Sequence, residues 1–355
     1  MIQTYTRIED IWKHQLNDVR EAKTSIFFEQ YIVENFEKDE IGRLFVDALI
    51  EKAKEGLVVR CIFDAQGTFS LFSNGELCRQ LTDAGAKILF YKTLRKIRKH
   101  NPVRLILRDH RKFLVIDNTI TWIGGAVIGE RFRGWSDLMV RFTNLDIAEV
   151  ASKEFKKQLL RLQDRRTLLA PLERVNEYYH FSGNAPGINN RFCYEEICHA
   201  IMLAQTSVVL VSPYFAPPYK LFRIIRRRLK EGLSITLVTP KITNHTLADI
   251  VRERYLYVFF SYGLQVEYVP HMLHAKAVMA DTHWVTFGSA NLDALSLIYN
   301  HELNLVSTDK DCVKEIAGAI DTYRASATRA TAEDSLYPHF SIWKKILSFV
   351  GKYFV

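Results

Sequence analysis

The chain has 355 residues, of which 48% are hydrophobic and 25% are charged, a composition typical of a globular protein long enough for two domains or one large duplicated domain. No run reaches the roughly 18 apolar residues of a membrane span. The polar N-terminal stretch lacks the apolar core of a signal peptide. Five cysteines form neither a CxxC motif nor a paired framework, which favours free thiols. We therefore expect a soluble or peripheral protein of a reducing compartment.

The predicted elements come in two similar series along the chain. A helix end leads into a buried strand at residues 22–28 (AKTSIFF) and again at 204–210 (AQTSVVL). Further helix-to-strand steps are marked by a glycine in each series: Gly56, Gly85, Gly232 and Gly263. Alternating helices and strands predict an α/β fold. The repetition predicts two pseudo-twofold-related α/β/α sandwich halves with mixed sheets.

The boundaries of these halves follow from the repeat. The first half is expected at residues 1–150 and the second at 191–330. A helical segment and linker, 151–190, joins them, because a helical pattern near 146–169 is followed by a stretch rich in Pro, Gly and Asn. Residues 331–355 form a separate tail.

The formal net charge of +8 is concentrated in one segment. Residues 92–112 hold nine Lys or Arg against the single acid Asp109, so this segment alone accounts for the excess. It runs directly into His110, and we expect it to attract an anionic, phosphate-bearing partner such as lipid headgroups or nucleic acid. A second basic cluster, residues 223–230, is interpreted as a solvated helix face.

The strongest signal is one pattern present twice, His110-x-Lys112-x4-Asp117 and His274-x-Lys276-x4-Asp281. A glycine follows each histidine by fourteen residues, and an acid follows by twenty-seven (Asp137) or twenty-eight (Glu302). One such match arises by chance at roughly the few-per-cent level. Two matches with shared flanks indicate a duplicated unit, and a duplicated His/Lys pair suggests one shared site.

Each motif is predicted to run along a strand, KFLVID or KAVMAD, with a hairpin partner, TITWIGG or HWVTFGS. The strands DLMVRF and ELNLVS then carry Asp137 and Glu302. Alternate strand residues share a face, so the His and Lys of one motif point the same way. Asp117 and Asp281 have the opposite parity and are expected to support the site without touching substrate.

This constellation predicts phosphoryl-transfer chemistry. One histidine attacks phosphorus and the other protonates the leaving alkoxide, then activates the acceptor hydroxyl. Lys112 and Lys276 offset phosphate charge, while Asp137 and Glu302 hold the far ring nitrogens. The backbone at Gly125, which follows Gly124, is expected to approach the anion closely. No metal or other cofactor is expected, because each histidine is paired with a lysine that repels cations.

At these residues the chain resembles the phospholipase D superfamily. The run HAKAVMADTHWVTFGSANLDALSLIYNHELNLV and the upstream SPYFAPPYKLF resemble bacterial cardiolipin synthases, in particular the shorter forms without N-terminal transmembrane helices. The resemblance covers about residues 20–310. It implies transfer of a phosphatidyl group from one phospholipid, typically phosphatidylglycerol, to the glycerol hydroxyl of another. It further implies that His110 is the nucleophile and His274 the acid and base, in a peripheral enzyme on the cytoplasmic side of a bacterial inner membrane.

The same resemblance assigns Gly125, Ser289 and Asn291 to the phosphate-binding segments. The family usually has asparagine after its first motif where this chain has Val127, whereas Asn291 is present in the second half. Other phosphodiester enzymes of the superfamily stay open: a phospholipase D, a phosphatidylserine synthase or a nuclease. The absence of an aromatic-interleaved platform argues against nucleic acid as the partner. A non-catalytic scaffold is disfavoured by two intact motifs.

Two further segments point to lipid. The aromatic run of residues 255–262 is expected mainly in the core, with some of it near a lipid entrance together with Tyr214 and Phe215. The C-terminal segment FSIWKKILSFVGKYFV, residues 340–355, places its Ser, Lys and Gly residues in one narrow stripe of an α-helix. It is too short to span a bilayer, and its basic stripe predicts binding to an anionic membrane surface. A helix packed on the protein's own core is the alternative.

Overall fold

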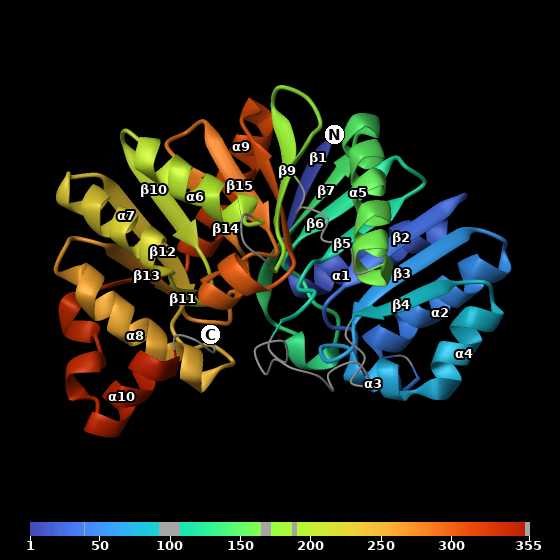
Figure 1. The fold of residues 1–355 in the computed structure, drawn as a ribbon, viewed down its shortest axis with the longest axis horizontal. Coiled ribbons are helices and arrows are strands. Elements are labelled where there is room, and N and C mark those ends of the chain that lie inside the picture. Colours follow the sequence, from blue (N-terminus) through green and yellow to red (C-terminus); the bar gives the residue numbers. More distant parts are fainter. Residues whose placement is uncertain (39, 92–106, 165–171, 187–189, 352–355) are drawn as a thin grey trace.

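The computed structural model describes residues 1–38, 40–91, 107–164, 172–186 and 190–351. Two mixed sheets stand side by side, each covered by helices on its outer face (Figure 1). The first sheet has the order β1-β7-β6-β5-β2-β3-β4 and the second β18-β13-β12-β10-β14-β15-β17-β9-β8. The predicted α/β sandwich of two related halves is confirmed.

The elements of the first half are the following. The strands are β1 (Ile2–Arg7), β2 (Ser25–Gln30), β3 (Val58–Asp64), β4 (Lys87–Tyr91), β5 (Phe113–Ile116), β6 (Ile120–Gly124) and β7 (Ser136–Thr143). The helices are α1 (Ile8–Glu21), α2 (Ile41–Lys54), α3 (Phe69–Ser73), α4 (Gly75–Asp83) and the 3-10 turn Glu130–Phe132. The long helix α5 (Leu145–Asp164) then leads to the second half.

The second half repeats this series with additions. Its strands are β8 (Leu172–Arg174), β9 (Tyr179–Asn184), β10 (Ser207–Val211), β11 (Phe215–Ala216), β12 (Ser234–Pro240), β13 (Gln265–Val269), β14 (Ala277–Ala280), β15 (Trp284–Gly288), β16 (Leu292–Asp293), β17 (Glu302–Ser307) and β18 (Thr328–Ala330). Its helices are α6 (Phe192–Leu203), α7 (Tyr219–Lys230), α8 (Thr246–Phe260), α9 (Lys310–Arg324) and α10 (Ile342–Val350). A π-helix spans Leu295–Tyr299, and 3-10 turns span Ala332–Asp334 and Tyr337–His339.

The duplication is visible in the strand order. Six strands run β7-β6-β5-β2-β3-β4 in one half and β17-β15-β14-β10-β12-β13 in the other, with the same parallel and antiparallel neighbours. The predicted motif strands, hairpin partners and acid-bearing strands are all present. The glycine steps also agree in pairs, since Gly56 and Gly232 have φ of 91° and 89° in the left-handed region that ends a helix.

The segment expected as a linker is only partly one. After α5, the strands β8 and β9 join the second sheet, where β9 pairs antiparallel with β17. Ser182, Gly183 and Asn184 make this strand read as a loop, because these residue types favour turns. Their places beside β17 are fixed by tertiary pairing that local sequence does not encode.

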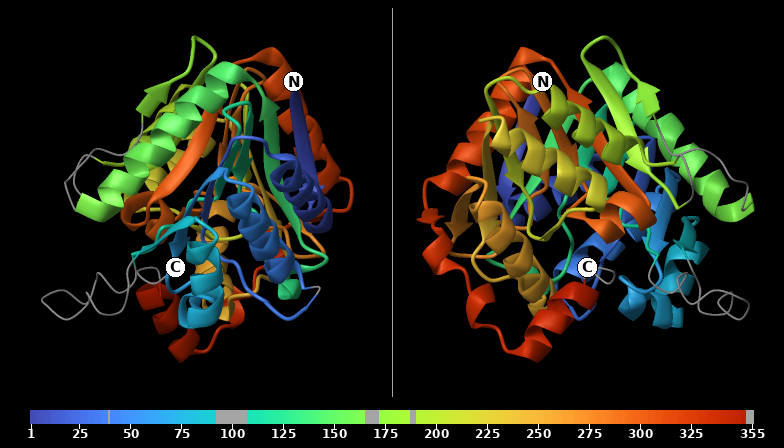
Figure 2. Two further views of the ribbon diagram at one scale, coloured as in Figure 1. Left: turned by 90° about the vertical axis from the view of Figure 1, so that its right-hand side faces the viewer. Right: turned by 60° about the vertical axis from the view of Figure 1, so that its left-hand side comes forward.

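Both motif strands are buried on two faces. In β5, Phe113 and Val115 enter a core shared between the two sheets, whereas Leu114 and Ile116 pack toward the helices of the first half. Strand β14 alternates in the same way between the shared core and the core under α6, α7 and α8. Double burial explains why these strands are short apolar runs without polar alternation. The halves are therefore joined by a common core, and the turned views show how closely they stand (Figure 2).

The C-terminal helix α10 packs on α8 in an unusual orientation. The end of its predicted polar stripe faces the protein, because Ser348 is fully buried and a side chain at Gly351 would meet Leu247 and Val251 of α8, whereas Ser341 and Lys344 are exposed. The apolar side chains face outward, with Ile342 67% and Trp343 76% exposed. The helix is thus docked on the protein, as in the alternative interpretation, but with its hydrophobic face open. Among the described residues no helix is long and apolar enough to cross a membrane.

Candidate active site

A cavity of about 600 Å³ opens where the two halves meet, and both motif histidines line it. Its walls come from each half: Tyr31, Ile32, Gln66, Gly67, Arg108, His110, Val127, Arg131, Phe132 and Trp135 from the first, and Tyr214, Asn244, His245, Leu247, Ala248, His274, Asn291, Asp293, Leu295, Ser296 and Asn300 from the second. The duplicated motifs therefore build one site, as the spacing predicts.

Each histidine is anchored to the opposite half. The backbone N–H of His110 donates to the carbonyl of His301 at 3.0 Å, and that of His274 donates to the carbonyl of Ser136 at 2.6 Å. The next residues along those partner strands are Glu302 and Asp137. One backbone contact thus brings each ring beside the acid of the other half.

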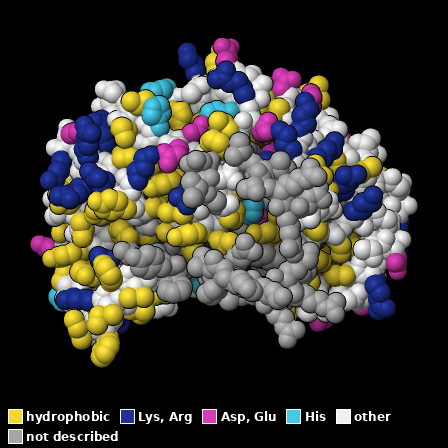
Figure 3. Space-filling model, viewed as in Figure 1, with side chains coloured by type: hydrophobic (Ala, Val, Ile, Leu, Met, Phe, Trp, Pro, Cys, Tyr) yellow, Lys and Arg dark blue, Asp and Glu magenta, His cyan; other side chains and the backbone are white. Residues whose placement is uncertain are grey.

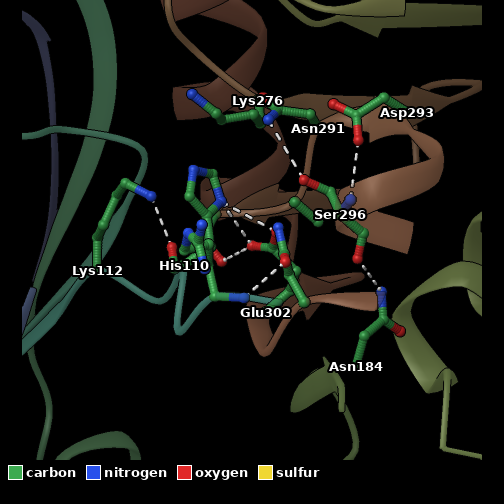
Figure 4. Close-up of polar contacts among 12 residues, drawn as sticks. His110, Lys112, Asn184, Lys276, Asn291, Asp293, Ser296 and Glu302 are labelled. Carbon is green, nitrogen blue, oxygen red and sulfur yellow. Dashed lines mark hydrogen bonds and ion pairs between the residues drawn. The ribbon is translucent and has the colours of Figure 1, made fainter. Parts of the chain in front are cut away.

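The ring contacts complete this exchange. Nδ1 of His110 lies 3.0 and 3.1 Å from the two carboxylate oxygens of Glu302, and Nδ1 of His274 lies 2.7 Å from Oδ2 of Asp137. Figure 4 shows the Glu302 contact with the polar side chains around it. A proton on Nδ1 donated to the carboxylate leaves Nε2 as the reactive atom on each ring. The sequence does not reveal that the acids are exchanged between the halves, since spacing alone fits either pairing.

The two lysines lie behind the histidines and are almost fully buried. Lys112 Nζ donates to the carbonyl of His110 at 2.6 Å, and Lys276 Nζ makes the same contact with His274. Burial lowers the pKa of Lys112 to about 8 and that of Lys276 to about 7, against the pull of Glu302 and Asp137. Two cations therefore stand behind the point where an anionic phosphate would meet both rings.

Both imidazoles favour the neutral form. Burial, followed by the Lys276 charge, lowers the pKa of His274 to about 3, and burial with both lysines lowers the pKa of His110 well below its usual value. An anion placed between the rings opposes these effects, because it stabilises an imidazolium. Binding of an anion between the rings would therefore be coupled to protonation of one of them.

The two supporting acids differ in charge preference. Burial raises the pKa of Glu302 to about 7. Burial also opposes ionisation of Asp137, but His274 and Lys276 outweigh it, so its pKa is lowered. Asp137 is consequently the better partner for an imidazolium, and the environment of His274 differs from that of His110.

The two acids also have different neighbours at equivalent loop positions. Ser289 follows His274 by the same fifteen residues that separate Gly125 from His110. The Ser289 hydroxyl donates to Glu302 at 2.5 Å. A Cβ at Gly125 would stand 2.4 Å from Asp137 Oδ1 and 3.1 Å from Lys276. Gly125 therefore allows Asp137 its place, whereas Ser289 adds a donor to Glu302.

The asparagine difference also reaches the cavity. Asn291 and Val127 both line it, one from each half. Asn291 Nδ2 donates to Ser296 Oγ at 3.3 Å, while its buried Oδ1 has no hydrogen-bond partner among the described residues. The cavity wall therefore has a polar amide in the second half where the first half has an apolar valine, so its lining is asymmetric.

The motif aspartates occupy the far ends of their strands. Asp117 accepts hydrogen bonds from the backbone N–H groups of Lys23, Thr24 and Ser25, at the start of β2. Asp281 makes the equivalent contacts with residues 205–207 at the start of β10. His110 and His274 precede the same strands, so each aspartate lies beyond the opposite end. The structure gives these carboxylates a strand-fastening contact and does not bring them to the cavity.

Tyr31, Trp135 and Asp293 line the cavity and were not predicted from the sequence, whereas Tyr214 was expected near a lipid entrance. Tyr31 meets the His110 ring edge-on with centroids 4.8 Å apart, and Tyr214 stands in a similar relation to His274 at 6.3 Å. Trp135 lies 5.5 Å from His274. Buried Asp293, whose pKa is raised to about 7 by burial, accepts from the Ser296 backbone at 2.8 Å. Tyr31 and Tyr214 follow the equivalent strands β2 and β10, so the repeat could have predicted Tyr31 from Tyr214.

The basic and aromatic segments have mixed outcomes. Residues 92–106 lie outside the described part of the chain. Of the described remainder, Arg108 lines the cavity, whereas Arg111 is buried in ion pairs with Glu29 and Glu154. Within the aromatic run Phe259 is core, as is Phe215, whereas Tyr214 faces the cavity as expected. Among the described residues no group of three or more His, Cys, Asp or Glu side chains is placed to hold a metal ion.

The shared two-motif cavity and the duplicated mixed sheets define a phospholipase D-like fold. A family model described as "Cardiolipin synthase, PLD-like domain" matches residues 16–159 and 197–323, so the chain belongs to this family. It is 29% identical to a cardiolipin synthase of Geobacillus sp. (strain WCH70) over 89% of this chain and 65% of the relative. It is 24% identical to the major cardiolipin synthase of Bacillus subtilis (strain 168), over 99% of this chain and 74% of the relative.

Lengths and solved structures complete the comparison. The chain spans 62% of a cardiolipin synthase 2 of Bacillus cereus, and thus less than two thirds of this relative and of the Geobacillus one. The crystal structure of phosphatidylserine synthase from Haemophilus influenzae Rd KW20 superposes with a TM-score of 0.74 at 15% identity, covering 99% of this chain and 92% of that one. At this identity the likeness is one of fold.

Proposed function

We propose that this protein is a cardiolipin synthase that transfers a phosphatidyl group from one phosphatidylglycerol to the glycerol hydroxyl of another. The observation that carries the proposal is the pair of buried imidazoles in one cavity, each held through Nδ1 by a carboxylate of the opposite half. Two rings held through Nδ1 by carboxylates, with two lysines behind them, suit in-line displacement at an anionic phosphodiester. Family membership supports the same substrate class.

The asymmetry of the acids supports His110 as nucleophile. Glu302 has a raised pKa, so it favours the neutral imidazole that attacks phosphorus. Asp137 has a lowered pKa and stabilises an imidazolium at His274, the form that donates a proton. This assignment agrees with the one that the family resemblance implies.

The reaction then has two balanced steps. Nε2 of His110 attacks phosphorus, the phosphorus–oxygen bond to the headgroup glycerol breaks, and Nε2–H of His274 protonates the departing oxygen. The hydroxyl of a second phosphatidylglycerol next gives its proton to His274 and attacks phosphorus as the phosphorus–nitrogen bond breaks. Cardiolipin and one glycerol are formed, and both histidines return to their starting states.

Binding to an anionic membrane surface belongs to this proposal. The outward apolar face of α10 carries Ile342, Trp343, Ile346, Leu347, Phe349 and Val350, each between 44% and 76% exposed. Figure 3 shows hydrophobic side chains gathered at the lower left of the molecule, with basic side chains among them. A surface of this kind suits the headgroup and acyl boundary of anionic lipids. We place the enzyme peripherally, on the cytoplasmic side of a bacterial inner membrane.

One experiment tests the proposed reaction. The purified protein is incubated with vesicles of phosphatidylglycerol, and lipid products are separated by mass spectrometry. Cardiolipin with released glycerol is expected, and His110→Ala and His274→Ala serve as inactive controls. Predominant phosphatidic acid would assign the protein to the hydrolases. No lipid turnover together with cleavage of nucleic acid would replace the proposal by a nuclease.

A further inference from the structure

An apolar groove of about 360 Å³ lies beside the active-site cavity in the second half. It is lined by Ala216, Pro217, Pro218, Tyr219, Phe222, Arg254, Tyr255, Val258, Ala294, Ile298 and Tyr299. Among the described residues that line it, Arg254 alone carries a charge. Because a cavity of this composition gains little from water, its natural occupant is apolar.

The groove and the cavity share two structural elements. Helix α8 lines the cavity through Leu247 and Ala248 and lines the groove through its later turns at Tyr255 and Val258. The segment after β16 does the same, since Leu295 faces the cavity and Ile298 the groove. A molecule whose phosphate lies between the histidines therefore has the groove within reach of its apolar part.

The groove also adjoins the proposed membrane surface. Arg254 lies over the ring of Phe349 at 4.7 Å, which links the groove lining to the outward face of α10. At its other side Tyr219 is 75% exposed. Figure 3 shows hydrophobic side chains extending over the region of α7 and α8 toward the centre of the molecule. The groove lining therefore contacts α10 at Arg254 and shares α8 and the segment after β16 with the active-site cavity.

We propose that this groove holds an acyl chain of the phospholipid whose phosphate is at His110 and His274. The inference rests on the proposed function and adds the position of the lipid tail to it. At about 30 Å³ for a group the size of water, the groove accommodates on the order of ten methylene groups. Arg254 stands where it can pair with an anionic headgroup of a neighbouring lipid.

The first test fills the groove. Val258→Trp places an indole in it, whereas Tyr257→Trp adds bulk one residue away on the exposed side of α8, against Tyr337. Transfer is measured in detergent micelles with long-chain and short-chain phosphatidylglycerol, and the chemistry with a soluble nitrophenyl phosphodiester that has no acyl chain. Displacing two or three methylenes lowers kcat/KM about tenfold or more. We expect that loss for the long-chain lipid in Val258→Trp alone, with less than a twofold change for the soluble ester.

The outcomes separate the groove from the reaction. Equal losses for long-chain, short-chain and soluble substrates would overturn the acyl-chain assignment. A second measurement does not depend on turnover or on the Trp variant folding well. Phosphatidylglycerol with a photoreactive diazirine in its acyl chain is cross-linked to the His110→Ala protein in micelles. Adducts at residues 216–222, 254–258 and 294–299 are expected. Adducts confined to other regions would overturn the assignment of the groove, even if the unmodified enzyme forms cardiolipin.

Discussion

The exchange of acids between the halves has a sharp kinetic consequence. Asp137 belongs to the first half but supports His274, and Glu302 belongs to the second but supports His110. Conservative substitutions should therefore sort by spatial partner and not by sequence half. Asp137→Asn should impair the same step as His274→Ala but to a smaller extent, and Glu302→Gln should impair the same step as His110→Ala to a smaller extent.

The magnitudes follow from the contacts. Removing a general acid or base costs about 10²–10⁴-fold, which is the loss expected for His274→Ala with natural lipid. An amide oxygen at position 137 can still accept from Nδ1 but carries no charge. Hydrogen bonds to charged groups contribute about 1.5–3 kcal/mol, so Asp137→Asn and Glu302→Gln should each lose about ten- to a hundredfold.

A phosphatidyl ester of nitrophenol separates the two roles, because its leaving group departs without a proton. In His274→Ala and Asp137→Asn we expect a burst of one equivalent of nitrophenolate, followed by slow turnover and a trapped phosphatidyl group on His110, located by mass spectrometry. Glu302→Gln should slow the burst itself, and His110→Ala should abolish it. Circular dichroism controls for folding.

The opposite sorting would refute the reasoning. If Asp137→Asn slowed the burst while Glu302→Gln left it intact, the observed pairing of rings and acids would not govern the chemistry. A burst in His110→Ala that is absent from His274→Ala would reverse the nucleophile but leave the exchange of acids standing.

Four further results are expected. Asp281→Asn should lower the free energy of unfolding by about 1.5–3 kcal/mol in urea titration, with kcat nearly unchanged. Because hydrogen bonds hold the folded pKa of Asp281 below its usual value, this stabilisation is present at neutral pH and is lost on acidification. An equal effect of the substitution at pH 7 and at low pH would count against this explanation. The kcat/KM should fall as pH rises through about 7 to 8, since Lys276 and Lys112 have lowered pKa values and lose their protons there. Lys276→Arg should shift this alkaline limb of the pH profile to higher pH. A flat profile would show that neither lysine charge affects the reaction. Activity should survive EDTA, and a strict need for a divalent cation would contradict the two-histidine chemistry. Deleting residues 340–355 should leave a folded enzyme, active on micelles, whose partition onto anionic vesicles drops at least a hundredfold, as measured by sedimentation; unchanged binding would assign α10 a purely structural role.

Local patterns predicted the parts of the fold that depend on local chemistry. The strand around Val115 is a continuous apolar run, and Gly56 and Gly232 end helices, so these elements could be placed from the sequence. The strand β9 could not, because Gly183 and Asn184 disfavour strands and only pairing with β17 holds them there. Tertiary context outweighed propensity at that position.

The candidate site shows the same division. Exact repetition of spacing identified both histidines and lysines and predicted a shared cavity. It could not show which acid serves which ring, since the nearly equal offsets of Asp137 and Glu302 from the histidine of their own half do not say which ring each acid contacts in space. Nor could it show the direction of α10, because an amphipathic pattern fixes two faces but not which of them meets the protein. The end of the polar stripe, at Ser348 and Gly351, packs on α8, whereas Lys344 is exposed.

Duplication by itself yields two equal catalytic units, but a displacement reaction needs unequal ones. One ring must be neutral when the other carries a proton, so the two environments have to differ. In this chain the two acids have different neighbours: Ser289 donates its hydroxyl to Glu302, which lowers the pKa of that acid and offsets part of the effect of burial, whereas Gly125 leaves room for Asp137. Burial raises the pKa of Glu302, whereas the His274–Lys276 pair lowers that of Asp137. The two halves therefore share a fold but differ in how strongly their acids favour the charged form. A small asymmetry in a duplicated site is thus sufficient to give two identical motifs different chemical roles.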